Sequence, residues 1–411
     1  MIWSKDMIKI IEGGVCAAKG FTAAGMHCGI RKNHSKKDLA LIYSEVKASA
    51  AAVYTTNKVK GAPLDVTRSN ISDGIAQAVI CNSGNANTCN ANGIAVATEM
   101  CELVAKELGI APTDVIVAST GVIGQPLDVT PIKCALPSLA SSLAKEGTQD
   151  AAAAIMTTDT KLKEIAVSFT VGGKECRMGG IAKGSGMIHP NMATMLVFIT
   201  TDCAIKPEML AKALSTDVQK TFNMVSVDGD TSTNDMVSVM ANGMAGNDMI
   251  CAEGEDFDEF MKALNTVTVD LCRKIAADGE GATKLLECKV SGAKDEKNAK
   301  IIAKSVICSS LVKAAMFGAD ANWGRILCAI GYSGAEVDVS KVDVSFVSKA
   351  GSIDVCKNGA GIPFSEEIAK KILLEDEITM DVRLGDGNAS SSAWGCDLTY
   401  DYVKINGDYR T

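Results

Sequence analysis

The chain of 411 residues is long enough for roughly two or three domains with sizeable hydrophobic cores. Its 41 lysines and arginines against 49 aspartates and glutamates give a formal net charge of −8 without a dense basic cluster, so we expect no nucleic-acid partner. Charges appear too early at the N-terminus for a signal peptide, and no apolar run approaches the roughly 20 residues of a membrane span. A membrane protein is therefore not expected either.

The 15 cysteines are scattered among apolar neighbours and never form a Cys-x-x-Cys pair. The odd count, the unpaired spacing and only 3 histidines argue against a disulfide framework and against a zinc site. We therefore expect buried free thiols, no bound metal and a cytoplasmic location.

The first part of the chain predicts strands followed by a helix. The apolar runs Leu39–Tyr43 and Ala48–Tyr54 predict two strands, and Ala76–Cys81 predicts a third that leads into the turn-forming residues Asn82–Asn87. A tight turn explains this asparagine-rich stretch, and support of an active site is the alternative. Helical spacing over Ala95–Leu108 predicts a helix.

A strand predicted over Val115–Ala118 runs into the glycine-containing loop Ser119–Gly124. Such a loop can point a backbone N–H and a threonine hydroxyl at one oxygen, which is the arrangement that stabilises the oxyanion of acyl transfer. Taken alone, Ser-Thr-Gly is more often a simple turn. A helix ending in the polar stretch Met156–Thr160 follows, and helix capping would explain its polar residues.

A glycine-rich run stiffens at Ala193-Thr194 into Met195–Ile199, which predicts a short buried strand. Two glycine pairs upstream bracket a hairpin that leads to Lys183. Without a functional role, Thr194 would simply fill a position in the strand, and Lys183 would be a solvated surface lysine. A hydroxyl at the start of a buried strand would, however, be rigidly held.

Pro207 begins a helical pattern that runs to about Thr221, and the acidic stretch Ser226–Asp235 follows. This stretch invites a calcium-loop interpretation, but it lacks the bidentate glutamate that completes such a loop. Phe257–Ile275 predicts a long amphipathic helix, with Glu280 just past its end. Because a helix C-terminus carries partial negative charge, a glutamate there intensifies a cation-attracting spot.

The last part of the chain predicts an α+β unit. A strand over Leu285–Val290 and a helix over Asp295–Met316 are expected first. Alternation around Val337–Val339, Ile378–Leu384 and Leu398–Val403 then predicts further strands.

Several of these stretches together resemble the ornithine acetyltransferase family, also called bifunctional glutamate and amino-acid N-acetyltransferases. The most specific is Lys-Gly-Ser-Gly-Met followed by Asn-Met-Ala-Thr-Met-Leu, which resembles the family's self-cleavage site. Family-like segments also occur at 119–124, 226–235, 278–284, 320–325 and 402–411. The resemblance covers Gly20 to Thr411, with Gly407 a small departure where alanine is common.

The resemblance implies a mixed α/β fold of packed mixed sheets flanked by helices, which processes itself between Ala193 and Thr194. Residues 1–193 would become the α chain, residues 194–285 would complete the catalytic domain, and residues 286–411 would form a C-terminal α+β domain whose tail returns to the active site. The two cleaved chains would assemble as an α2β2 heterotetramer.

The resemblance also assigns roles to individual residues. Thr194 would be the nucleophile, and Thr120 with Gly121 would form the oxyanion site. Substrate contacts are carried over to Thr157, Lys183, Glu280, Asn406 and Thr411. The chemistry suits a freed N-terminal threonine, because its new α-amino group, with an unperturbed pKa of roughly 7.7–8.0, can act as the base that the hydroxyl needs.

The implied activity moves the acetyl group from N2-acetylornithine to glutamate through an acetyl-Thr194 ester, in arginine biosynthesis and without a cofactor. The family contains members that also accept acetyl-CoA and members that do not, and the sequence leaves this open. An amidohydrolase or aminopeptidase with the same processed threonine is the alternative, since only the acceptor differs. A non-catalytic metabolite-binding protein would need neither the Ala-Thr bond nor the oxyanion loop.

Overall fold

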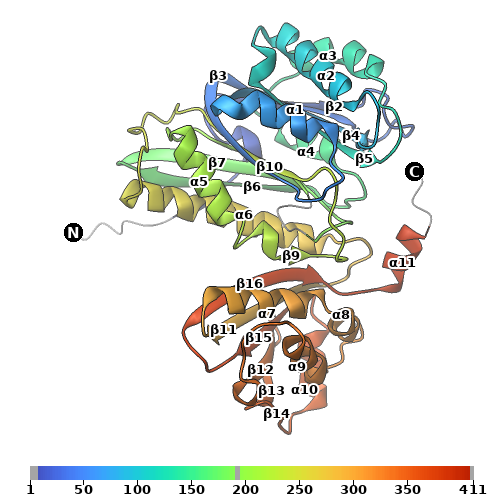
Figure 1. Cartoon of the computed structure of the whole chain (residues 1–411), viewed down its shortest axis with the longest axis vertical. Coiled ribbons are helices and arrows are strands. Elements are labelled where there is room, and N and C mark those ends of the chain that lie inside the picture. The colour runs from blue at the N-terminus through green and yellow to red at the C-terminus, as the bar shows by residue number, and fades with distance from the viewer. Residues whose placement is uncertain (1–7, 190–194, 408–411) are drawn as a thin grey trace. The chain divides into compact units, whose positions relative to one another are not determined.

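The computed structural model describes residues 8–189 and 195–407 (Figure 1). The chain forms two compact units, each built from separated segments. The first unit comprises residues 1–184, 191–219 and 231–271, and the second comprises 185–190, 220–230 and 272–411. Mixed sheets with helices packed on them make up both units, so the expected fold class is confirmed.

In the described part of the first unit, one mixed sheet of nine strands runs in the order β1-β6-β7-β8-β10-β3-β4-β5, with β2 paired to β3. Its strands are β1 (Lys9–Ile11), β2 (Phe21–Met26), β3 (Leu39–Tyr54), β4 (Ile75–Asn85), β5 (Val115–Val122), β6 (Lys163–Val171), β7 (Lys174–Lys183), β8 (Leu196–Thr201) and β10 (Met236–Ala241). The helices of this unit are α1 (Ala62–Asn70), α2 (Gly93–Leu108), α3 (Thr130–Ser141), α4 (Thr148–Ile155), α5 (Pro207–Asp217) and most of α6 (Glu255–Ala277).

The long strand β3 connects the two halves of this sheet. Its first half pairs with β4 and its second half with β10, and the register shifts between Tyr43 and Ala48. The two strands predicted here are therefore one strand, because the polar residues between them form an irregularity in the ladder instead of a turn.

A hydrophobic core joins both halves of the sheet. Ile116 and Ala118 of β5 belong to the same buried cluster as Ile181 of β7 and Phe198 of β8. Because side chains alternate along a strand, the next positions facing this core are Thr120 on β5 and Lys183 on β7. The other face of β4 and β5 packs against α2 and α3.

The second unit contains a seven-stranded sheet, counted over its described residues, in the order β14-β13-β12-β15-β11-β16-β9. Its strands are β9 (Val225–Ser226), β11 (Leu285–Ala293), β12 (Asp343–Ser348), β13 (Gly351–Lys357), β14 (Ala360–Gly361), β15 (Glu377–Arg383) and β16 (Ala389–Cys396). Its helices are α7 (Glu296–Cys308), α8 (Ser310–Phe317), α9 (Trp323–Gly331), α10 (Glu366–Leu373) and α11 (Tyr400–Asn406). Helix α7 packs on β11 and β16.

Three predictions for this unit are wrong. The helix predicted over 295–316 is broken at Ser309, which is extended and whose hydroxyl accepts from the Val312 N–H to begin α8. Residues 339–341 form a 3-10 turn, because the Asp338 carboxylate accepts from the Ser340 N–H. The strand predicted over 398–403 is instead the exposed helix α11, where alternation reflects no buried sheet face.

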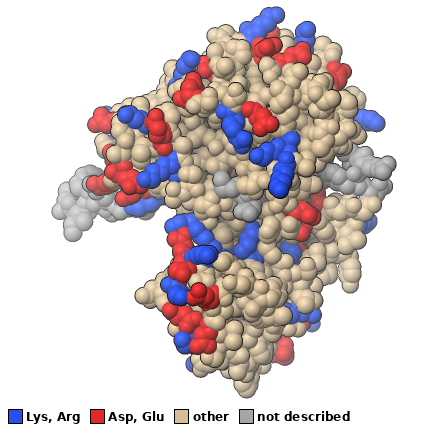
Figure 2. Space-filling model, viewed as in Figure 1, with Lys and Arg blue, Asp and Glu red and all other residues tan. Residues whose placement is uncertain are grey.

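Positive and negative side chains are interspersed on the face of the molecule in Figure 2, which is typical of an ordinary protein surface. None of the helices in the described residues is both long and apolar enough to cross a membrane.

Candidate active site

The predicted oxyanion segment lies at the end of β5. Thr120 is buried, with 8% of its surface exposed, and it faces the core described above. Gly121 has a φ of 133°, and a Cβ at this position would lie 2.3 Å from the Gly84 carbonyl carbon. Because both the backbone conformation and the close approach of β4 require glycine, this residue type is explained by local structure.

Lys183, the last residue of β7, meets Thr120 across the core. Its Nζ lies 3.4 Å from Thr120 Oγ1, and 9% of the residue is exposed. Lys183 pairs in register with Leu196 at the start of β8. The preceding residue, Met195, is held in place because its carbonyl accepts from the Met236 N–H at 2.9 Å. The predicted cleavage site, Ala193 and Thr194, lies outside the described residues.

Asp159, which the sequence reasoning missed, links two of the predicted site residues. Its carboxylate accepts from the Thr157 N–H at 3.0 Å and from the Gly184 N–H at 2.7 Å. It also pairs with the buried Lys163 at 2.7 Å. Burial alone would raise the pKa of Asp159, but the ammonium groups of Lys163 and Lys183 hold it well below its usual range. The carboxylate therefore stays charged and fixes the backbone beside Thr157 and Lys183.

Asp235 is a second missed residue in this part of the unit. It is 3% exposed, and its Oδ2 has no hydrogen-bond partner among the described residues. Burial raises the pKa of Asp235 well above its usual range, although the charge of Lys183 opposes the shift. Asp235 is therefore a buried carboxyl group on which desolvation and the charge of Lys183 act in opposite directions. Its signal in the sequence was weak, because the acidic stretch that contains it indicates a structured loop beside the site but singles out no one carboxylate.

The asparagine-rich stretch, predicted as a turn, instead forms the end of β4 up to Asn85, and it supports the predicted oxyanion segment. Ser119, which precedes Thr120, donates its hydroxyl to Asn82 Oδ1 at 2.6 Å. Asn82 in turn donates to the Asn85 carbonyl at 2.9 Å. The end of β4 is thus hydrogen-bonded directly to β5, the strand that carries Thr120. Such a contact is what the alternative interpretation, support of an active site, would require.

The second unit brings Glu280 and Asn406 together. Asn406, the last residue of α11, donates its Nδ2 to Glu280 Oε2 at 2.8 Å. The Glu280 N–H donates to the Ser185 carbonyl at 3.0 Å. A Cβ on Gly186 would lie 2.4 Å from the Glu280 carboxyl carbon, so only glycine allows this close approach. Thr411 lies outside the described residues.

Residues 185–189 of the second unit are held by the acidic stretch that invited a calcium interpretation. The Asp228 carboxylate accepts hydrogen bonds from the N–H groups of Met187 and Ile188 at 2.6 and 2.9 Å. Its two oxygens therefore bind backbone N–H groups. No group of three or more His, Cys, Asp or Glu side chains in the described residues is placed to hold a metal ion.

His189 belongs to a partly buried polar cluster within the second unit. Its Nδ1 lies 3.1 Å from Ser226 Oγ and 3.5 Å from Cys308 Sγ. Burial lowers the pKa of His189 to about 4, and the Lys304 charge adds to the shift. The imidazole is therefore neutral at neutral pH.

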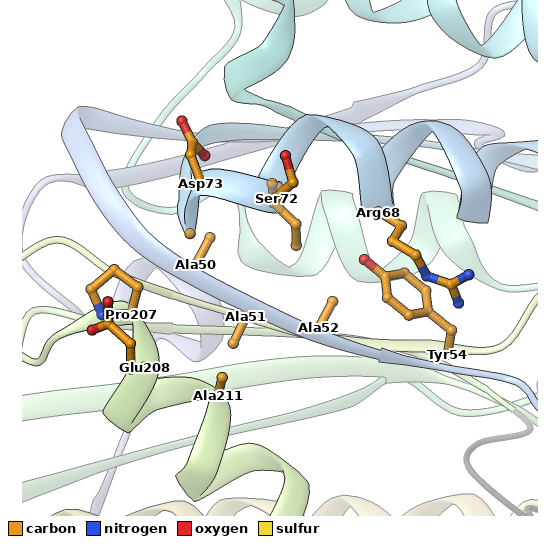
Figure 3. Close-up of a pocket in the computed structure, with 12 residues that line it drawn as sticks. Ala50, Ala51, Ala52, Tyr54, Arg68, Ser72, Asp73, Pro207, Glu208 and Ala211 are labelled. Atoms are coloured by element: carbon orange, nitrogen blue, oxygen red, sulfur yellow. The ribbon is translucent and has the colours of Figure 1, made fainter.

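A hollow of about 430 Å³ lies elsewhere in the first unit (Figure 3). It is open above the alanines of β3, with Tyr54 and Arg68 toward one side and Asp73 and Glu208 toward the other. The Arg68 guanidinium carbon lies 4.7 Å from the centre of the Tyr54 ring. None of the predicted site residues that the structure describes lines this hollow, so it is separate from the candidate active site.

Comparisons with known proteins agree with the motifs. The ArgJ family matches residues 22–411. The arginine biosynthesis bifunctional protein ArgJ of Caldanaerobacter subterraneus subsp. tengcongensis is 53% identical over 405 residues, covering 98% of this chain and 100% of that protein. The protein of the same name from Bacillus subtilis is 49% identical over 410 residues, covering 99% of each.

A solved structure of arginine biosynthesis bifunctional protein ArgJ from Bacillus halodurans is also similar. It is 50% identical with a TM-score of 0.50, and it covers 52% of this chain and 99% of its own. Since the family match spans nearly the whole sequence and the full-length relatives share about half of their residues with it, the predicted resemblance is confirmed and this chain belongs to the ArgJ family, the ornithine acetyltransferases.

Proposed function

We infer that this chain is an acetyltransferase of arginine biosynthesis that moves the acetyl group from N2-acetylornithine to glutamate. The observation that carries this inference is the 53% identity, along the full length, to a relative whose name assigns it to arginine biosynthesis. The meeting of Lys183 and Thr120 in a buried part of the first unit supports it, because these are two of the residues that the family resemblance selects.

In the proposed first half-reaction, the Thr194 hydroxyl attacks the acetyl carbonyl of the donor while the α-amino group of Thr194 takes the hydroxyl proton. The negative charge on the carbonyl oxygen is stabilised by the Thr120 hydroxyl and the Gly121 N–H. Collapse of this intermediate returns the proton to the leaving amine and releases ornithine. The acetyl group is then an ester on Thr194.

In the second half-reaction, the α-amine of glutamate attacks this ester, and the same groups stabilise the new oxyanion. The α-amino group of Thr194 takes the proton that the attacking amine loses and returns it to the Thr194 oxygen as the ester C–O bond breaks, so Thr194 is regenerated and N-acetylglutamate leaves. The chain's own residues carry out every step, so the proposed reaction needs no cofactor. Acetyl-CoA is proposed as a second acetyl donor that can load the same threonine.

The substrate's charges are proposed to meet matching groups on the protein. Lys183 pairs with the carboxylate and Glu280 with the cationic amine, while Thr157, Asn406 and Thr411 complete the contacts. Support comes from each unit separately. Asp159 holds the backbone beside Lys183, and Asn406 orients the Glu280 carboxylate.

We also propose that the chain cuts itself before Thr194 and that the two products form a cytoplasmic α2β2 assembly. The solved relative from Bacillus halodurans supports the cut, because nearly all of that chain corresponds to only 52% of this one. Residues 194–411 make up a similar share of the sequence.

Product analysis tests the proposed activity. Purified protein with acetylornithine and glutamate should give ornithine and N-acetylglutamate in equal amounts, and omission of glutamate should stop turnover after the first acetyl transfer. Steady release of acetate without glutamate would instead identify an amidohydrolase. Acetyl-CoA with glutamate, in the absence of acetylornithine, tests the second donor.

A further inference from the structure

A buried side-chain amide lies beside the oxyanion segment of the first unit. Asn234 precedes β10, and 5% of it is exposed. Its Nδ2 donates to the Ser119 carbonyl at 3.0 Å and to the Ala86 carbonyl at 2.6 Å. Its Oδ1 accepts from the hydroxyls of Thr88 and Thr233 at 2.5 and 2.6 Å. All four hydrogen bonds that an amide side chain can make are therefore formed.

The bond to Ser119 matters because of the next residue. The Ser119 carbonyl and the Thr120 N–H belong to one planar peptide unit, so holding the oxygen fixes the orientation of the unit that leads into Thr120. The Ser119 hydroxyl is held from another direction by Asn82. Both the carbonyl and the side chain of Ser119 are therefore hydrogen-bonded, immediately before the proposed oxyanion donors.

Sheet hydrogen bonding alone does not fix this end of β5. The register between β4 and β5 shifts at Gly84 and Asn85, where one residue pairs with two on the other strand. Irregular pairing leaves backbone groups without a regular ladder partner. Asn234 donates to two carbonyls that flank this irregularity, those of Ala86 and Ser119.

Asn234 also connects the oxyanion segment to the strand that follows the nucleophile. The second residue after Asn234, Met236, donates its N–H to the Met195 carbonyl and pairs in register with Leu196. Met195 is bonded to Thr194 in the sequence. The amide therefore bridges the two parts of the sheet whose relative position sets the oxyanion geometry.

We propose that Asn234 is a positioning residue for acyl transfer, which holds the Ser119–Thr120 peptide in the orientation that aims the Thr120 hydroxyl and the Gly121 N–H at the developing oxyanion. This inference rests on the proposed function. Loss of one oxyanion donor costs about 10²–10³-fold in rate, and loosening the peptide that carries the donors costs part of that, about 10–100-fold.

Two substitutions test the role of Asn234. Asn234→Asp keeps the shape and the acceptor for Thr88 and Thr233 but removes both donations, and Asn234→Ala removes the whole amide. Both should lower kcat for acetyl transfer by about 10–100-fold, with KM for acetylornithine within about threefold of wild type. Folding is followed in parallel by circular dichroism.

Asn247 provides a matched control. This buried asparagine also donates to two carbonyls of the first unit, those of Ala204 and Asp248, at 3.2 and 2.8 Å. Asn247→Asp and Asn247→Ala report the general cost of removing such an amide, and their kcat should stay within about threefold of wild type.

Coupling to Thr120 separates positioning from a general loss of structure. Because Asn234 is proposed to act through the oxyanion donors, Asn234→Ala should slow the Thr120→Ala protein by clearly less than it slows wild type, since only the Gly121 N–H then remains to be misaligned. Multiplying effects would overturn the inference. So would Asn234 variants with wild-type kcat, or Asn234 variants that fail to fold while their Asn247 counterparts do fold. A wild-type protein without acetyl transfer would instead refute the proposed function.

Discussion

At the scale of single residues, charge placement distinguishes the candidate site from the rest of the core. Lys183 is buried, and its Nζ lies against the Thr120 hydroxyl. Its charge lowers the pKa of both Asp159 and Asp235, but the net pKa shift is downward for Asp159 and upward for Asp235. Asp159 has two lysines nearby and hydrogen bonds from two N–H groups, so it stays ionised. At Asp235, burial outweighs the charge of Lys183 and the hydroxyls of Ser232 and Thr55, so the pKa of that carboxyl is raised.

The Thr120 hydroxyl is proposed to donate to the oxyanion. Thr120→Ala should lower the rate of acyl transfer by about 10²–10³-fold, because this donor is aimed at charge that develops only in the transition state. Stopped-flow release of ornithine measures the first half-reaction directly, and circular dichroism checks the fold. A loss smaller than about threefold would reject the role.

Glu280 is proposed to bind the cationic amine of the donor. Glu280→Gln keeps a partner for Asn406 but removes the negative charge, so affinity for acetylornithine should fall by about tenfold or more, as expected for a charge-assisted hydrogen bond. Calorimetric titration of the Thr194→Ala protein measures it without turnover. Glu287→Gln is the control, since Glu287 is also buried in the second unit but pairs with Arg273. Unchanged affinity in Glu280→Gln would refute the assignment.

At the scale of elements, the candidate site residues of the first unit lie at the ends of strands. Lys183 ends β7, Thr120 lies near the end of β5, and the strand β8 begins just after the predicted nucleophile. The ends of buried strands combine rigid backbone on one side with loop freedom on the other. In the second unit, residues 185–189 are instead fixed by side chains, through Asp228 and the cluster around His189.

The low pKa of His189 predicts a pH dependence of stability. The group titrates at about 4 in the folded protein and at about 6.5 when unfolded. Its contribution is therefore fully present above about pH 6.5 and is lost as the pH falls toward about 4, because only the unfolded chain binds the proton. The groups around it are Lys304, Asp230, Ser226 and Cys308.

Urea unfolding of the uncleaved Thr194→Ala chain, with and without His189→Gln, measures this contribution. The unfolding free energy should fall less steeply over this pH interval when His189 is absent. His34→Gln is the control, because His34 is exposed and should leave the slope unchanged. Equal slopes with and without His189 would contradict the expectation.

At the scale of the whole molecule, the proposed cut runs through a single sheet. Residues 178–183 of strand β7, which precedes Thr194, pair with the whole of β8, which follows it. Strand β10 then pairs with β3, which again belongs to the first part of the chain. Hydrogen bonds and a shared hydrophobic core thus connect the two products, so we expect them to stay associated after cleavage without a covalent link.

Self-cleavage is tested by mass spectrometry of the purified protein. Two fragments that correspond to residues 1–193 and 194–411 should appear, and they should separate only in denaturant. Thr194→Ala should remain uncut and inactive. An intact chain with full activity and no fragments would rule out the mechanism.

Kinetic order is a further property of the whole enzyme. If donor and acceptor use one pocket in turn, ornithine leaves before glutamate binds, and the acetyl group waits on Thr194. Double-reciprocal plots at several glutamate concentrations should be parallel, and the donor alone should add one acetyl group to the fragment 194–411. Intersecting lines together with an unmodified fragment would indicate direct transfer in a ternary complex.

Local sequence rules predicted elements well where one face of an element is buried. The helix over 95–108, the strand after 115 and the long helix ending before Asp278 all form, since their apolar periodicity matches the core that they meet. The same rules failed at 295–316, 339–341 and 398–403. At the first two places a single capping side chain sets the backbone conformation, and at the third the helix is exposed. Hydrophobic periodicity predicts neither a cap nor an exposed helix.

Long motifs specify the family and the residue types of the candidate site without reference to the fold. Which of these residues meet depends on how the chain folds. Lys183 and Thr120 are 63 positions apart, and Asn234 reaches the Ser119 carbonyl across 115 positions. Asp159, Asn234 and Asp235 sit in polar stretches that look solvated, and they acquire their roles through burial. Burial and the partners it provides are properties of chain topology, which local patterns do not encode.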